Sequence, residues 1–215
     1  MDRKIPRISS PSILFMLIFL LFSMLAYAEE AQEEENPKDS RIEYHTMGDQ
    51  VFGINAGLFI PLFINNPSLS WDDSDAFNST NLSLGGNGSL FYGAYVNNNI
   101  ILGMEVGAMF ASSPNKHNFY MIPITLRGTY EFQFLNNLIS VPVYLGAGIN
   151  MTSYLDSFHV EMILKPGIGA YWNYSSNWSF GMNTTYWWVP QLYSDGEYNR
   201  FGNFMDVSLS AVYHF

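Results

Sequence analysis

From residue 51 onward, apolar side chains alternate along the chain with side chains that are mostly small or polar. Alternation with a period of two is typical of β-strands, because successive side chains of a strand point to opposite faces. In the first run, the apolar positions are Phe52, Ile54, Ala56, Leu58 and Ile60. The pattern recurs seven more times and predicts eight strands, which begin near residues 52, 82, 102, 120, 141, 162, 180 and 205.

The lengths of these runs favour a membrane barrel over a soluble sandwich. Each run covers about 12–16 residues, whereas strands of soluble proteins usually have about 5–6 residues. A strand that crosses a bilayer needs about 9–11 residues, and longer strands extend beyond the membrane. In such a barrel the apolar face contacts lipid and the polar face lines the lumen.

The gaps between the runs indicate which end of the barrel is which. They cover residues 64–81, 97–99, 112–118, 134–139, 153–160, 175–177 and 190–202, and the first, third, fifth and seventh are longer than their neighbours. Long outer loops alternate with short periplasmic turns in outer-membrane barrels. We expect tight turns at residues 97–99 and 175–177, since asparagine tolerates a positive φ angle.

Large aromatic residues collect at the strand ends next to the short turns, where they would form an interfacial girdle. They are Phe52, Tyr130, Phe132, Trp172, Tyr174, Trp178, Phe180, Tyr213 and Phe215. An even number of strands also returns the C-terminus to the periplasmic side, and closure pairs every backbone group in lipid. The predicted fold is an all-β, eight-stranded antiparallel transmembrane up-and-down β-barrel.

The N-terminus has the layout of a secretory signal peptide. Basic residues precede an apolar run at residues 13–25, and a small-x-small cleavage site, Ala26-Tyr27-Ala28, follows. The alternative is a permanent membrane anchor, for which the run is short. Residues 29–49 are acidic and have almost no apolar periodicity, so they predict a disordered periplasmic linker. The predicted organisation is a signal peptide (1–28), a linker (29–49) and a barrel (50–215).

Composition excludes several classes of function. The chain has 17% aromatic and only 13% charged residues, and it has no cysteine, so disulfides and thiolate metal sites are absent. Arg3, Lys4, Arg7 and Asp2 lie within residues 1–28, which leaves six basic and eighteen acidic side chains and a formal charge of −12 in the mature part. An acidic surface repels phosphates, so we expect no nucleic acid as a partner. The apolar outer face of the predicted barrel instead implies outer-membrane lipids as partners.

The end of the chain resembles the assembly signal of bacterial outer-membrane proteins, a last strand with a terminal phenylalanine. Its alternating positions are Val207, Leu209, Ala211, Tyr213 and Phe215. This resemblance implies the barrel assembly machinery as a partner.

Two internal segments resemble the OmpW family. Residues 142–150 (PVYLGAGIN) resemble its PYxGAGxN segment, and Pro123 with residues 126–132 (LRGTYEF) resembles its fourth strand. The resemblance covers roughly residues 50–215 and implies a barrel that passes small hydrophobic molecules sideways into the bilayer. The acidic linker and the low-complexity first loop depart from what we expect of that family.

Four charged residues are expected to point into the lumen. Glu105 and Arg127 lie on adjacent strands, and Lys165 and Asp206 lie at similar depth across the barrel. Because the interior of an eight-stranded barrel is just filled by side chains, its charges must be paired or hydrated. We interpret the four as a polar plug of the lower lumen; the alternative is structural pairing alone. Neither reading leaves an open aqueous pore.

Seven apolar residues are expected to point inward near the outer mouth, above the charged floor. They are Phe59, Met109, Met121, Ile163, Trp187, Val189 and Phe204. One hypothesis is a pocket that binds or conducts small hydrophobic solutes, and the alternative is ordinary filling of the barrel.

Two other classes of function remain open. One is a lipid A-modifying enzyme, since some small outer-membrane barrels act on lipid A with histidine and serine. Histidines at 117 and 159 lie near serines at 112, 113 and 157, but no spacing among them matches a hydrolase motif, so this alternative ranks last and we predict no catalytic residue. Loops 65–81 and 190–203 are polar, acidic and aromatic, as in a structural or adhesive OmpX-like surface protein. The aspartates of the first loop lack EF-hand spacing, and neither a metal site nor a cofactor is predicted.

Overall fold

The computed structural model describes residues 45–70, 72–73, 75–113, 117–155, 157–193 and 196–215. The predicted signal peptide, with its cleavage site at Ala26 and Ala28, lies outside these residues, as does the linker up to residue 44. Among the described residues, none of the helices has the length and apolarity needed to cross a membrane.

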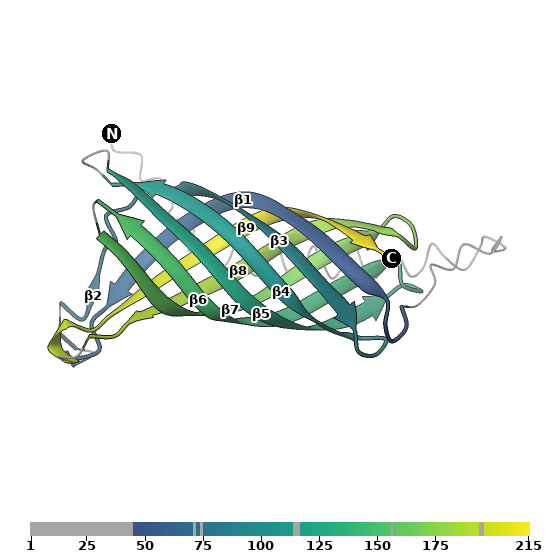
Figure 1. Ribbon diagram of the computed structural model, residues 1–215, viewed down its shortest axis with the longest axis horizontal. Coiled ribbons are helices and arrows are strands. Elements are labelled where there is room, and N and C mark those ends of the chain that lie inside the picture. The colour runs from purple at the N-terminus through teal and green to yellow at the C-terminus, as the bar shows by residue number, and fades with distance from the viewer. Residues whose placement is uncertain (1–44, 71, 74, 114–116, 156, 194–195) are drawn as a thin grey trace, which may run out of the picture. The chain divides into compact units, whose positions relative to one another are not determined.

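Eight long antiparallel strands form a closed barrel (Figure 1), which confirms the predicted fold class. Each strand pairs with its neighbour in the chain, and the first strand pairs with the last. A two-residue strand, β2 (Phe77–Asn78), pairs with the outer end of β1, and a short 3-10 helix, η1 (Gly196–Tyr198), precedes the last strand. The long strands are β1 (Gln50–Asn65), β3 (Gly85–Tyr95), β4 (Ile100–Ser112), β5 (Asn118–Phe134), β6 (Ile139–Tyr154), β7 (Ser157–Asn173), β8 (Trp178–Gln191) and β9 (Arg200–His214).

The two faces of the wall have opposite character. In the middle of β5, the Leu126 side chain points outward and is 73% exposed, while the adjacent Arg127 points into the lumen and is 7% exposed. The same alternation runs along the other strands, with large apolar side chains outside and polar side chains buried inside. A soluble sandwich has the reverse arrangement, so the outer surface of this barrel is suited to lipid.

The two ends of the barrel differ in their connections. The end near the C-terminus, here the turn end, carries the short connections 96–99, 135–138 and 174–177. The opposite end, the loop end, carries β2 and the connections 66–84 and 192–199 (Figure 1). The prediction of a long loop in the fifth gap, at residues 153–160, is wrong. There β6 and β7 stay paired out to Tyr154 and Ser157, because Phe158 and Val160 continue the exposed apolar face.

The tight turns do not use the backbone conformation expected of them. None of residues 97–99 and 175–177 has a positive φ angle. Instead, the Asn97 side chain accepts hydrogen bonds from the backbone N–H groups of Asn99 (2.9 Å) and Ile100 (2.8 Å). Ser175 Oγ accepts in the same way from the N–H of Trp178 at 3.1 Å. Positive φ angles occur instead in the turn between β5 and β6, at residues 135–137.

The aromatic residues predicted as a girdle contact one another on the outer surface at the turn end. The rings of Trp178 and Tyr213 lie 4.9 Å apart, and those of Tyr213 and Phe215 lie 4.8 Å apart. The rings of Tyr130 and Phe132, on β5, are also 4.8 Å apart. Such a cluster marks the level at which a barrel meets the membrane surface.

A charge on the outward face in the middle of β5 tests this assignment. Leu126→Arg should lower the free energy of unfolding in lipid vesicles by about 2–4 kcal/mol, because the guanidinium would face hydrocarbon. Leu192→Arg is the matched control, since Leu192 is 65% exposed but lies in a connection at the loop end. Urea titration followed by tryptophan fluorescence measures both variants. Equal effects of the two substitutions would contradict a lipid-facing Leu126.

Candidate functional site

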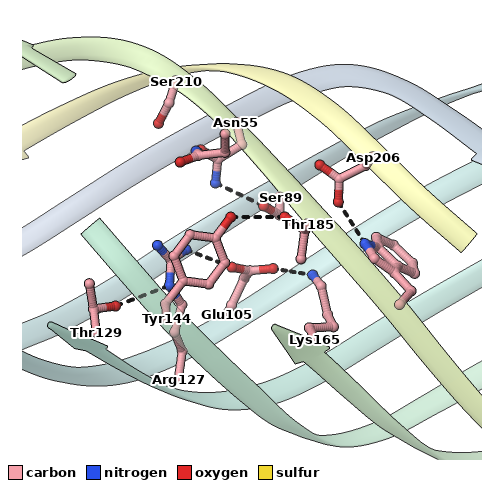
Figure 2. A network of polar contacts seen from close by, with 12 residues as sticks. Asn55, Ser89, Glu105, Arg127, Thr129, Tyr144, Lys165, Thr185, Asp206 and Ser210 are labelled. Atoms are coloured by element: carbon pink, nitrogen blue, oxygen red, sulfur yellow. Dashed lines mark hydrogen bonds and ion pairs between the residues drawn. The ribbon is translucent and has the colours of Figure 1, made fainter. Parts of the chain in front are cut away.

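An ion cluster closes the middle of the lumen (Figure 2). Arg127 Nη1 donates to Glu105 Oε2 at 2.9 Å, and Lys165 Nζ forms an ion pair with the other oxygen of the same carboxylate. All three side chains are buried. One carboxylate, on β4, thus holds two cations from two other strands, β5 and β7, and the structure brings together three of the four residues of the predicted plug.

The fourth residue, Asp206, is joined to this cluster through a tryptophan. Asp206 Oδ2 accepts a hydrogen bond from Trp187 Nε1 at 2.6 Å, and Lys165 Nζ lies 4.5 Å from the centre of the Trp187 ring. Among the described residues no ion pair to Asp206 is formed. Trp187, expected only as an apolar pocket residue, therefore links the charged layer to the apolar layer above it.

Aromatic rings enclose the Arg127 guanidinium. Its Cζ lies 3.6 Å from the centre of the Tyr144 ring and 4.6 Å from that of Phe91. The Tyr144 hydroxyl shares a hydrogen bond of 2.8 Å with Thr185 Oγ1 (Figure 2). Gly167 makes room for this ring, because a Cβ there would lie 2.4 Å from Tyr144. The cation is thus held by a carboxylate and by two π faces, as a buried guanidinium requires.

Below the ion cluster, the turn end of the lumen is also filled. Val51, Phe91, Tyr95 and Ile101 form a second buried apolar cluster. The His45 ring, from the segment before β1, stacks on Tyr95 at 4.6 Å and on His214 at 4.2 Å. Burial lowers the pKa of His45, which keeps its ring neutral in this stack.

Sequence reasoning missed this second cluster. Its members break the rule that inward positions are polar. Val51, Phe91 and Ile101 are apolar, yet they stand at the alternate positions whose side chains point into the lumen. Apolar residues at these inward positions were the sequence signal that could have predicted the cluster.

The seven apolar residues predicted near the outer mouth pack together as one buried cluster, which also includes Ala111. The Phe59 ring lies 5.1 Å from Phe204 and 5.5 Å from Trp187. Most of the group therefore fills the lumen instead of lining an open pocket. Three of the seven, Met121, Val189 and Phe204, line a larger space at the loop end.

That space is a cavity of about 410 Å³ at the loop end, here called the mouth cavity. Met121, Val189 and Phe204 line it from the apolar cluster, with Leu82 and Phe119 beside them. Its polar lining includes Thr152, Glu161 and Gln191. The cavity thus combines apolar side chains with several polar groups, a composition that suits a small-molecule site.

The wall beside the mouth cavity has an interrupted ladder, here called the β7–β8 seam. Leu164 and Trp188 are the outermost partners between these strands. Beyond them, β7 pairs only with β6, and Val189–Gln191 of β8 pair only with β9. Pro190 lies in this stretch and has no N–H group to donate.

A side-chain hydrogen bond bridges the seam in place of the ladder. Gln191 Nε2 donates to Glu161 Oε1 at 2.6 Å. The outward side chains next to the seam, Phe158, Val160 and Met162, are apolar and exposed. The seam therefore separates the mouth cavity from the apolar outer surface of the barrel.

The residues considered for other chemistry do not converge. His117 and His159 are exposed, and no side-chain hydrogen bond joins either of them to a serine in the described chain. Within the same residues, no group of three or more histidines and acids is placed to hold a metal ion.

Comparison with known proteins supports the fold and identifies relatives. A protein-family model matches residues 30–213. A protein of Borreliella burgdorferi is 28% identical over 195 residues, which cover 80% of this chain and 85% of that protein. A protein of Treponema pallidum is 27% identical over 200 residues, which cover 88% and 90%.

Two solved structures have a similar fold. Neisserial surface protein A matches with a TM-score of 0.55 and 13% identity, over 78% of this chain and 97% of that chain. The outer-membrane protein OprG of Pseudomonas aeruginosa matches with a TM-score of 0.50 and 12% identity, over 80% and 97%. At these identities the likeness concerns the fold alone, which is that of a small outer-membrane barrel.

Removal of the shared carboxylate tests the ion cluster. Glu105→Gln should lower the free energy of unfolding by about 3–5 kcal/mol, because it leaves Arg127 and Lys165 buried without their counter-ion. Glu131→Gln is the control, since this buried acid accepts a hydrogen bond from the neutral Tyr95 hydroxyl at 3.0 Å. It should lose only about 1 kcal/mol. Urea unfolding in vesicles measures both, and equal losses would show that ion pairing does not stabilise the lumen.

Proposed function

The chain belongs to the protein family whose model matches residues 30–213, and for this member we propose a role as an outer-membrane barrel that binds small hydrophobic molecules and releases them sideways into the bilayer. The observation that supports this proposal is the position of the mouth cavity. It lies at the loop end of the lumen, and the β7–β8 seam lies beside it. A molecule of a few hundred cubic ångströms would fit such a space.

The filled lumen argues against passage along the barrel axis. A molecule that left the mouth cavity downward would have to displace the buried cluster around Phe59, then the ion cluster around Glu105, then the cluster around Tyr95. Each layer is close-packed or charge-paired, so its disruption is costly. The seam is the path with the least structure to break, because Glu161 and Gln191 bridge it by one side-chain hydrogen bond.

The resemblance of residues 142–150 to the OmpW family points in the same direction. In this proposal the chain is an OmpW-like member of the small outer-membrane barrels. Residues 1–28 are removed as a signal peptide after Ala28, and the last strand, ending at Phe215, is recognised by the barrel assembly machinery. Residues 29–49 are a periplasmic linker, whose last residues, from His45 onward, pack against the turn end of the barrel.

Cross-linking across the seam tests sideways release. Because the chain has no cysteine, Glu161→Cys/Gln191→Cys introduces the only two thiols, and a short bis-thiosulfonate reagent can join them. Cells with a lipopolysaccharide-containing outer membrane would express this variant. We expect uptake of the apolar dye N-phenylnaphthylamine to be faster than in vector controls, to fall to the control rate after cross-linking, and to recover after reduction.

A second pair controls for cross-linking as such. Ser153→Cys/Phe158→Cys joins partners of β6 and β7 near the same end, where the ladder is already closed, so uptake should not change. An uptake rate that is insensitive to the 161–191 cross-link, at equal protein levels, would contradict release through the seam.

Exposed apolar side chains at the loop end favour a second candidate, adhesion. Leu192, Tyr193 and Tyr198 are 65%, 48% and 63% exposed outside the long strands. Such side chains suit contact with another surface. If adhesion is the function, replacing residues 192–199 by a short glycine-serine connection should reduce binding of expressing cells to extracellular matrix several-fold and leave dye uptake unchanged. Unaltered matrix binding would remove this candidate.

A further inference from the structure

The mouth cavity contains one acidic side chain in an otherwise apolar or neutral lining. Glu161 lies on β7, on the lumen side, and is half-buried. Its Oε1 accepts the hydrogen bond from Gln191 Nε2 at 2.6 Å, and its Oε2 accepts one from Thr152 Oγ1 at 2.9 Å. Both donors are uncharged, so they orient the carboxylate without neutralising it.

The lysines and arginines of the described chain are Arg127, Lys165 and Arg200. None of the three forms an ion pair with Glu161. The first two pair with Glu105 in the middle of the lumen. Arg200 turns toward the loop, where its Nη1 donates to the backbone carbonyls of residues 197 and 199 at 3.0 and 2.6 Å.

A carboxylate in this position favours one class of ligand. A charge that is partly removed from water is costly unless an opposite charge is near. A ligand ammonium that reaches Glu161 would supply that charge through a charge-assisted hydrogen bond, while a ligand carboxylate would be repelled. The apolar side chains of Met121, Val189 and Phe204 stand within the same cavity, where they can contact the rest of the ligand.

We infer that the mouth cavity selects amphipathic amines, molecules with a protonated amino group on an apolar chain or ring, and that Glu161 is their counter-ion. This inference rests on the proposed function and narrows it to one chemical class. Fatty acids and other anionic amphiphiles are disfavoured by the same carboxylate and by the exposed acids Asp72, Asp73 and Asp75 of the connection between β1 and β3 at the loop end.

Three eight-carbon probes test the selection: octylamine, octanol and octanoate at neutral pH. The full barrel in nanodiscs would carry Asn81→Cys, a position that lines the cavity, labelled with a solvatochromic dye. The same dye on Ser176→Cys, in a turn at the opposite end, reports non-specific partition into the bilayer. We expect octylamine to half-saturate the response at a concentration at least tenfold below that of octanol, and octanoate to bind more weakly than octanol.

Two variants identify the group responsible. Glu161→Gln keeps the shape of the side chain and should remove the preference, so that octylamine and octanol half-saturate the response of this variant at similar concentrations. Asp75→Asn removes a charge from the exposed loop and should keep the preference for octylamine.

The possible failures are distinct. If octanol binds but octylamine binds no more tightly, or if Glu161→Gln keeps the preference, the inference is overturned and the cavity remains a hydrophobic site. If none of the three probes changes the signal at position 81 beyond that at position 176, the proposed function itself fails.

Discussion

The wall of this barrel is a single layer of strands, and its two faces require different surroundings. Leu126 and Arg127 are neighbours in the chain, yet one is exposed on the outer surface and the other is buried in the lumen. A bilayer can cover the outer face, but it contributes nothing to the inner one. The interior must therefore satisfy its own charges and fill its own space, and the remaining structure follows from this requirement.

The lumen meets the requirement in three layers. Apolar clusters fill it at both ends, around Tyr95 and around Phe59, and the cluster of Glu105, Arg127 and Lys165 lies between them. This arrangement leaves the mouth cavity where the upper layer meets the loop end. The incomplete ladder between β7 and β8 lies beside the same cavity, so a binding space and a weak point of the wall coincide.

Alternation alone was sufficient to predict the eight strands, the lumen side of each strand and the seven residues of the upper apolar cluster. Each of these follows from whether a position in a strand points inward or outward. Alternation does not show at which level along the barrel axis a side chain lies relative to side chains on other strands. For that reason the sequence did not show that Asp206 would accept a hydrogen bond from Trp187, a residue of the upper apolar cluster.

Features that depend on partner strands were beyond the sequence. The hairpin of β6 and β7 extends to residues 154 and 157, although polar residues there resemble a loop. The β7–β8 seam arises from which strand Val189–Gln191 pairs with, and Pro190 was its only visible sign. The role inferred for Glu161 likewise needs the positions of Thr152 and Gln191, which come from two other strands.

The orientation of the wall can be measured directly by site-directed spin labelling of β5 in lipid vesicles. Labels would be placed singly at positions 124, 125, 126 and 128, in a chain that has no other thiol. The account predicts that labels at 124, 126 and 128 collide with oxygen dissolved in the bilayer and not with a water-soluble nickel chelate, and that a label at 125 is shielded from both. Collision of the label at 126 with the nickel chelate would place the apolar face in water and contradict the account.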